Sequence, residues 1–356
     1  MKTDCRALSG ALGELVRVAD QRASVPILSH VMLRAAAGVL TLRATDLSRN
    51  LTCQLPAEGD LVTCLPAKLL AALVKPEGRS DAGDVVIEPE GETSCTVTLD
   101  GLTSRVHAMS PEEFPAGLAA DDTQWSLLAL WPAVAIGEAL RFVLPAASPD
   151  EGRPHLNGVC LDLGRIAATD GHRVHVAELP GQIPEPMLIP LQAAVTLDRI
   201  LKLDDQVILA RADDVLRMRV GAWELETRLV DARFPPVDKV IPGDRPVTMS
   251  LDSALLLKAL SRVSRLSRER LIRVTVNGQI TITTTDPDLG TAEVVVPVLD
   301  TSHEGDDLVL GFNSTYLSDA LGSSRDVVRF GMAGPTDAVR LDLDEGRFAV
   351  IMPMRL

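Results

Sequence analysis

Three weak copies of one unit follow one another along the chain, and this repeat restricts the fold more than any other feature. Three markers recur in the same order, each at a spacing of roughly 120 residues. The first is an aspartate after an alternating segment, at Asp46, Asp170 and Asp286. The second is a junction between an apolar strand and a helix pattern, at Pro66, Pro190 and Asn313. The third closes each copy, at Phe114-Pro115, Phe234-Pro235 and Met352-Pro353.

Each copy has the pattern of a mixed helix and strand domain. Segments such as VMLRAAAGVLTLRATD alternate apolar and polar residues around a glycine, which is typical of a β-hairpin. Helical patterns open the copies near residues 5–19, 130–143 and 251–268. The sequence therefore predicts an α+β protein of three similar domains at residues 1–119, 120–243 and 244–356, with linkers near 119–123 and 243–245.

Composition indicates a globular protein with a large core. The chain has 356 residues, 46% of them hydrophobic, and a net charge of −14 at pH 7. No apolar run reaches the roughly 18 residues of a membrane span, and no signal-peptide core opens the sequence, so we expect a cytoplasmic protein. The five cysteines are scattered without a C-x-x-C pair, which argues against a zinc site or a disulfide framework.

The segment Asp170-Gly171-His172-Arg173-Val174-His175 carries residue types that recur in acid–base and metal sites. In a strand, His172 and His175 would point to opposite faces and could not share a metal ion. No common nucleotide-binding, zinc-protease or serine-hydrolase motif occurs. We therefore predict no metal and no cofactor, and a structural or binding histidine is favoured over a hydrolase that uses Asp170 and His172.

One predicted helix, near residues 251–268, is basic in an otherwise acidic chain. Lys258, Arg262 and Arg265 follow helical spacing on one face, and an apolar stripe occupies another face, at Leu256, Ala259, Leu260 and Val263. This pattern fits a helix that packs on a sheet and meets phosphates, and it also fits a solvated basic face. Weaker basic positions on other predicted helices are Lys68, Arg141, Arg199 and Lys202.

Five stretches resemble the bacterial DNA polymerase III beta subunit, the replicative sliding clamp. They are SVPILSHVMLRAAAGVLTLRATD, LNGVCLDLGRIAATDGHRVHVAELP, LVDARFPPVDKVIP, LVLGFNSTYLSDAL and the terminal VIMPMRL. They occur in order from Ser24 to Leu356, so the resemblance covers nearly the whole chain.

The resemblance implies three clamp domains per subunit and a head-to-tail homodimeric ring with helices lining the hole and sheets outside. Such a ring encircles double-stranded DNA without reading sequence and gives the polymerase its processivity, without catalysis of its own. The implied partners are the DNA polymerase III catalytic subunit, the clamp-loader complex, and other clamp-binding polymerases and repair proteins. The resemblance also adds Arg22, Arg153 and His155 to the DNA-facing candidates.

Members of this family also have a cleft between the second and third domains that binds short apolar peptide motifs. Carried over residue by residue, its walls would be Leu156, Thr169, Gly171, His172, Arg173, Val174, Pro235, Lys239, Val240, Asn313, Tyr316, Val339, Val350, Ile351, Met352, Pro353, Met354, Arg355 and Leu356. Read without the resemblance, the C-terminal apolar run is typical of a core strand.

Two departures from the family pattern leave an alternative open. Lys239 stands where the family often has arginine, and Glu269 falls where an apolar or aromatic residue can line the cleft. Aromatic residues are 3% of the chain. A divergent or second-copy clamp with altered partners, or with resistance to an inhibitor of the cleft, is therefore the alternative within the same fold.

Overall fold

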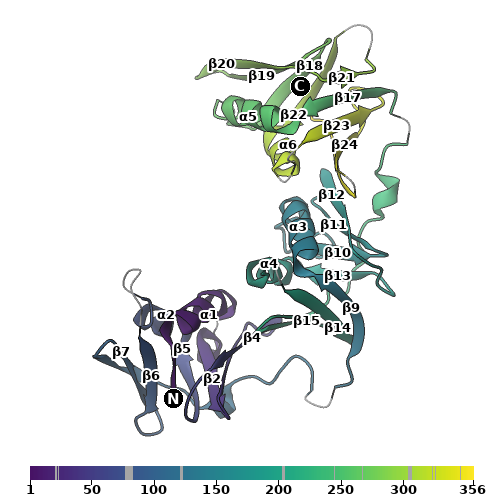
Figure 1. The fold of residues 1–356 in the computed structure, drawn as a ribbon. Helices are drawn as coiled ribbons and strands as arrows, with labels where there is room; N and C mark the ends of the chain where they lie inside the picture. The colour runs from purple at the N-terminus through teal and green to yellow at the C-terminus, as the bar shows by residue number, and fades with distance from the viewer. Residues whose placement is uncertain are drawn as a thin grey trace. The chain divides into compact units, whose positions relative to one another are not determined.

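The computed structural model describes the chain except for residues 21, 23, 77–82, 121–122, 203–204, 244, 267, 304–306, 323, 325 and 345. Positions 121, 122 and 244 of the two predicted linkers therefore lie outside the described residues. The fold is α+β, as predicted, with long antiparallel sheets and few helices (Figure 1). Its contacts divide it into two compact units: residues 1–134 with 195–229, and residues 135–194 with 230–356.

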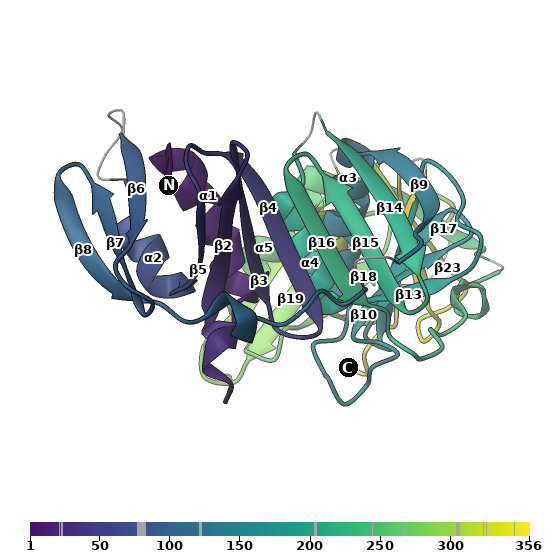
Figure 2. The same ribbon diagram turned by 90° about the horizontal axis from the view of Figure 1, so that it is seen from below.

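The first unit holds two sheets. The smaller has the order β1 (Lys2–Asp4), β6 (Asp84–Pro89), β7 (Ser94–Leu99) and β8 (Leu102–His107). The larger, seen from its broad face in Figure 2, has the order β5 (Leu61–Pro66), β2 (His30–Ala36), β3 (Val39–Thr45), β4 (Arg49–Pro56), β16 (Trp223–Arg228), β15 (Val215–Val220), β14 (Gln206–Ala212) and β9 (Ser126–Pro132). Strands of the first and second repeats thus share one sheet, because β4 pairs with β16 antiparallel.

The second unit repeats this plan. Its larger sheet has the order β13 (Met187–Pro190), β10 (Gly158–Asp162), β11 (Arg165–Thr169), β12 (Arg173–Glu178), β25 (Arg347–Ile351), β24 (Val339–Asp344), β23 (Val327–Met332), β17 (Val247–Asp252) and β21 (Asp300–Thr301). Its smaller sheet has the order β20 (Gly290–Val296), β19 (Ile280–Asp286), β18 (Leu271–Val276) and β22 (Leu308–Asn313). Here β12 pairs with β25, so the second and third repeats also share a sheet.

Two helices belong to each repeat. They are α1 (Cys5–Val18), α2 (Ala67–Leu73), α3 (Ala133–Val143), α4 (Leu191–Ile200), α5 (Ser253–Val263) and α6 (Ser314–Leu321), with short 3-10 turns at Pro26–Ser29, Pro111–Glu113, Leu144–Ala146 and Val237–Lys239. The side chains of Asp4, Asp252 and Asn313 cap α1, α5 and α6 by accepting hydrogen bonds from backbone amides. The predicted opening helices are confirmed, although α3 begins later than expected because residues up to Pro132 form β9.

Helix α5 ends at Val263, earlier than the predicted boundary near residue 268. The Ser264 hydroxyl donates to the Leu260 carbonyl at 2.5 Å, and the Leu266 amide then bonds to Val263 in a turn. The predicted apolar stripe is buried as expected, at Leu256, Ala259, Leu260 and Val263. Arg265 therefore belongs to the turn that follows the helix.

All five cysteines are buried free thiols, at Cys5, Cys53, Cys64, Cys95 and Cys160. Burial raises the pKa of the Cys53 thiol to about 11, and those of Cys64 and Cys160 to about 12. Within the described part of the chain, no helix is long and apolar enough to cross a membrane.

Candidate functional site

The predicted cleft residues all lie in the second unit, around the joined strands β12 and β25. Val174 of β12 is paired with Val350 of β25, and both valines are buried with Ala167 and Val176 in one apolar cluster. Phe234, Val237 and Ile241 pack against this cluster from the segment that precedes the third repeat. The structure therefore brings this segment, which contains Pro235, Lys239 and Val240, to the same face of the sheet.

Burial separates the predicted cleft residues into two groups. The buried group consists of Leu156, Thr169, Arg173, Val174, Val339, Val350 and Ile351. Those available to a ligand are exposed: Gly171, His172, Lys239, Val240, Met352, Met354, Arg355 and Leu356, with Pro235, Asn313, Tyr316 and Pro353 half-buried. Among the exposed group, Val240, Met352, Met354 and Leu356 keep 49%, 44%, 40% and 54% of their surfaces exposed. We call these four exposed side chains the apolar rim.

Two backbone hydrogen bonds fix the C-terminal tail that carries most of the rim. The Met352 amide donates to the His172 carbonyl at 2.9 Å, and the Met354 amide donates to the Gly311 carbonyl at 2.8 Å. A side chain at Gly311 would collide with the Met354 carbonyl, so glycine permits this close approach. The tail thus joins the loop before β12 to strand β22.

An ion pair holds the other wall of the site. Arg165 of β11 donates through both terminal nitrogens to the Asp238 carboxylate, with the shorter distance 3.0 Å. This guanidinium lowers the pKa of the Asp238 carboxyl, mainly through the hydrogen bond. Asp238 directly precedes Lys239 and Val240, so this exposed pair links their segment to β11.

Arg173 is buried and lies at the centre of a polar network. Its Nε donates to the Asp170 carboxylate at 3.1 Å, one terminal nitrogen donates to the Asp319 carboxylate of α6 at 2.6 Å, and the other donates to the Pro145 carbonyl. Its guanidinium also lies over the Tyr316 ring, 4.3 Å from the ring centre. Sequence reasoning named Arg173 as a wall residue and missed its acceptors, because Pro145 and Asp319 are far from it in the chain.

Glu269, the residue that departs from the family pattern, is exposed next to the start of α6. The neighbouring Arg270 carbonyl accepts a hydrogen bond from the Ser314 amide at 2.8 Å, and the Arg270 side chain donates to the Thr315 hydroxyl at 3.3 Å. Glu269 is thereby held beside the helix that carries Tyr316.

The two histidines differ in burial, although His172 lies in the bend before β12 and not in the strand as the alternating pattern assumed. His172 is exposed, whereas His175 is fully buried, with its ring stacked on Phe142 and its Nδ1 donating to the Phe142 carbonyl at 2.7 Å. Burial lowers the pKa of His175 to about 4, so this histidine is neutral at pH 7. Among the described residues, no group of three or more His, Cys, Asp or Glu is placed to hold a metal ion.

Asp170 is not arranged as a hydrolytic base. One carboxylate oxygen accepts from the His172 and Arg173 amides at 2.9 and 3.1 Å, and the other accepts from the Arg173 side chain. Both oxygens of this carboxylate are thus engaged by donors of its own loop and of Arg173. These contacts favour a structural role for Asp170 over the hydrolase alternative.

The basic face of α5 is exposed as its spacing predicts. Lys258 and Arg262 on the helix and Arg265 after it are all exposed, opposite the buried stripe. No carboxylate among the described residues forms an ion pair with any of these three cations. Their charges are therefore available to an external anion.

The other predicted basic positions differ from one another in exposure and in ion pairing. Lys68, Arg199, Lys202 and Arg22 are exposed in the first unit, and Arg141 is exposed at the end of α3 in the second. Arg153 is paired with Asp150 at 2.9 Å, and His155 is half-buried. Arg153 therefore already has an anionic partner inside the protein.

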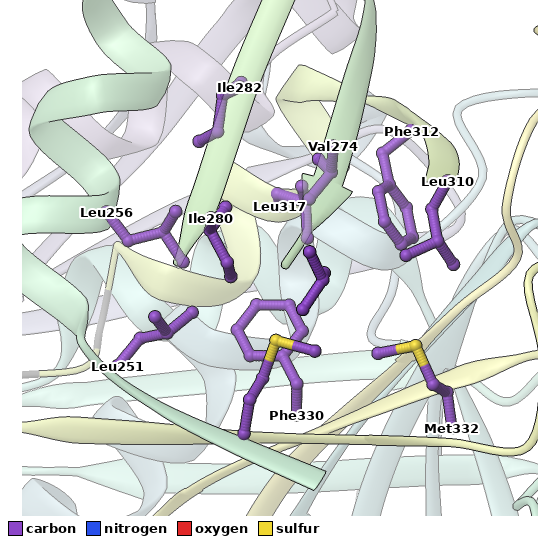
Figure 3. A pocket seen from close by; sticks show the side chains of 12 residues that line it. Leu251, Leu256, Val274, Ile280, Ile282, Leu310, Phe312, Leu317, Phe330 and Met332 are labelled. Carbon is purple, nitrogen blue, oxygen red and sulfur yellow. The ribbon is translucent and has the colours of Figure 1, made fainter. Parts of the chain in front are cut away.

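A cavity of about 20 Å³ lies in the core of the second unit (Figure 3). Its lining comes from both sheets and from α5 and α6: Met249, Leu251, Leu256, Val274, Val276, Ile280, Ile282, Leu310, Phe312, Leu317, Phe330 and Met332. The labelled side chains expose only carbon and sulfur to it. A void of this size, close to that of one water molecule and without polar partners, is a packing gap rather than a ligand site.

Two family models match parts of the chain. Residues 135–236 match the family model of the DNA polymerase III beta subunit, central domain, and residues 238–355 match that of its C-terminal domain. The chain is 28% identical to the beta sliding clamp of Caulobacter vibrioides over 98% of both proteins, and 27% identical to that of Escherichia coli over 94% of both. The solved structure of the Pseudomonas aeruginosa sliding clamp bound to griselimycin is similar at a TM-score of 0.90 and 26% identity, over 100% of this chain and 99% of that one.

Proposed function

The chain belongs to the family of bacterial DNA polymerase III beta subunits, and from this premise we propose that two copies close a ring around duplex DNA and hold the replicative polymerase on its template. It is a sliding clamp and a processivity factor, not an enzyme. The relatives are named as beta sliding clamps without qualification, so a specialised paralogue is not favoured.

The observation that carries the DNA-binding part of the proposal is the basic face of α5. Lys258, Arg262 and Arg265 are exposed and have no carboxylate partner in the described structure, whereas the protein as a whole has a net charge of −14. A local basic surface on an acidic protein supports weak phosphate contacts that do not depend on sequence. Retention would then depend on encirclement. The division into three domains at residues 1–119, 120–243 and 244–356 is part of this proposal.

The apolar rim is the docking site that we propose for the partners. Exposed methionine and leucine side chains next to a rigid, buried network suit a groove that accepts several related apolar peptides. The partners proposed for it are the polymerase III catalytic subunit, the clamp loader, and other polymerases and repair proteins that act in the cytoplasm. Glu269 and Lys239 would add charge selection at its edge.

Encirclement predicts a dependence on DNA topology. After loading by its own clamp loader onto a nicked circular plasmid, the protein should stay bound during gel filtration and should be lost once the circle is cut. Retention would be read from labelled protein that co-elutes with the DNA. Equal retention on linear and circular DNA at the same salt concentration would contradict encirclement.

The basic face predicts a defined change in salt dependence. Replacing Arg262 and Arg265 together by glutamate should lower the slope of log K against log salt by about 1.8, since each lost phosphate contact removes about 0.9. The protein should remain folded, because exposed charges rarely contribute more than about 1 kcal/mol to stability. Fluorescence anisotropy of labelled duplex DNA across a salt series would measure the slope.

A matched control makes the same change of charge at two other arginines of the second unit. Arg273 of β18 and Arg329 of β23 are exposed arginines on strands, so Arg273→Glu with Arg329→Glu should leave the salt slope near that of the unaltered protein. If both pairs of substitutions changed the slope equally, the α5 face would be only a solvated surface.

A further inference from the structure

Each of the two long sheets contains one junction at which a strand of one repeat pairs with a strand of the next. In the first unit this junction is β4 with β16, and in the second it is β12 with β25. In both cases the joining strand begins at the arginine of the sequence Thr-Asp-x-x-Arg. The two junctions can therefore be compared residue by residue.

The first junction is held by Arg49. One oxygen of Asp46 accepts from the Ser48 and Arg49 amides at 3.0 and 2.9 Å, and the other accepts from the Arg49 Nε at 2.9 Å. The buried guanidinium then donates to the Thr196 hydroxyl on α4 at 2.8 Å, and to the Arg17 carbonyl at 3.4 Å. We call this arrangement of an aspartate, an arginine three residues later and an acceptor on the helix of the next repeat the arginine lock.

The second junction has the same lock. Asp170 and Arg173 repeat the contacts of Asp46 and Arg49, and the Arg173 guanidinium reaches Asp319 on α6 and the Pro145 carbonyl. Thr196 and Asp319 occupy the same place, the sixth residue of α4 and of α6. The residue after the aspartate has a positive φ in both copies, 71° at Leu47 and 95° at Gly171.

The third copy has lost the arginine. Asp286 still accepts from the Asp288 and Leu289 amides at 2.9 and 3.0 Å, but Leu289 stands where the lock needs arginine, and it is 54% exposed. Pro287 occupies the position of Leu47 and Gly171, and its ring holds φ at about −65°. Arg268, an exposed side chain, lies 3.6 Å from the Asp286 carboxylate instead.

The helix acceptor is also missing. The helices α4 and α6 supply the acceptors of the first two junctions, so α2 of the first repeat is the corresponding helix for a third. The sixth residue of α2 is Ala72, which is exposed and has no polar side chain. Strand β20, which follows Leu289, and strand β8, which follows α2 in its repeat, are both edge strands of their sheets. Leu102 on β8 is 70% exposed. The arginine and the helix acceptor of the lock are thus both absent. The two strands that would form a third junction, β20 and β8, each have one edge without a partner strand in this chain.

We propose that the junction between two copies of this chain, β20 of one against β8 of the other, is built without the arginine lock, and that Leu289 and Ala72 set its strength. The pairing of two copies rests on the proposed function, whereas the missing lock is the new step. Apolar contacts replace a buried charge network at this junction. The junction between copies would therefore separate more readily than either junction within a chain.

The test restores the lock. The variant Pro287→Gly/Leu289→Arg/Ala72→Asp reproduces the second junction, and we expect subunit exchange about tenfold slower than in the unaltered protein, because a buried charge-assisted hydrogen bond must break. Exchange would be followed by energy transfer between copies labelled with a donor or an acceptor dye. The variant Pro287→Gly/Leu289→Arg/Ala72→Thr, which carries the threonine acceptor of the first junction, should change exchange in the same direction.

The matched control is Pro287→Gly/Ala72→Asp, which lacks only the guanidinium and should exchange at least as fast as the unaltered protein. If both restored variants are folded dimers by circular dichroism and light scattering and exchange no more slowly than this control, the missing-lock inference is overturned while the clamp function stands. If the unaltered protein is a monomer at micromolar concentration, the two-copy ring itself fails. The two failures are therefore distinguishable.

Discussion

Replacing Arg173 by alanine should lower the free energy of unfolding by about 3 kcal/mol, because it leaves the carboxylates of Asp170 and Asp319 without their buried cation. The Asp170 side chain is 14% exposed and that of Asp319 is 29% exposed, so water compensates Asp319 more than Asp170. The substitution also removes the donor to the Pro145 carbonyl and the cation above Tyr316. Urea unfolding followed by circular dichroism would measure the change.

Arg153 offers the control for this substitution. It is paired with Asp150 in the same unit, but its side chain is 46% exposed. Arg153→Ala should therefore change the free energy of unfolding by less than about 1 kcal/mol, as for other surface ion pairs. Similar losses for Arg173→Ala and Arg153→Ala would mean that the buried network does not hold the second and third repeats together.

Deleting Met352–Leu356 should weaken the binding of a polymerase-derived apolar peptide by at least about a hundredfold. The deletion removes three of the four side chains of the apolar rim, and each central apolar contact is expected to contribute about 1–2 kcal/mol. It also removes the hydrogen bonds of the tail to His172 and Gly311. Isothermal titration calorimetry would give the affinity, and light scattering should show that the dimer survives.

Single substitutions separate the rim from a general loss of structure. Met354→Ala should weaken peptide binding by about 1–2 kcal/mol, because it removes one exposed contact. Leu163→Ala changes a leucine of similar exposure in the turn between β10 and β11, at the opposite end of those strands from the Thr169–Arg173 loop, and should leave binding unchanged. An unaltered affinity for Met354→Ala in a folded protein would remove the tail from the binding site.

Local patterns predicted much of the fold. The alternating segments before Asp46, Asp170 and Asp286 form hairpins, and the helix that starts after Asn313 has the expected cap. The exposed positions of Lys258 and Arg262 and the buried stripe of α5 also follow from spacing alone, whereas Arg265 lies in the turn after the helix. These features depend on residues a few positions apart, for which periodicity is a direct signal.

Features that join distant segments could not be predicted in this way. The pairing of β4 with β16 and of β12 with β25 joins strands more than 100 residues apart, and nothing in either strand alone specifies its partner. Because of these shared sheets, the contacts form two units, and residues 120–243 are divided between them. The acceptors of Arg173 were missed for the same reason. The cleft positions came from the resemblance to the family. Their burial in the structure then distinguished the exposed side chains of the apolar rim from the buried residues.

The buried thiols have a consequence for chemical labelling and oxidation. Only the thiolate is reactive, and pKa values of about 11 to 12 for Cys53, Cys64 and Cys160 leave almost none of it at neutral pH. All five sulfurs are also enclosed by the core, so alkylating dyes and peroxide reach them only when the protein opens. A cysteine introduced on the surface would therefore take up a dye selectively, and the native protein should tolerate oxidative stress without forming cross-links between copies.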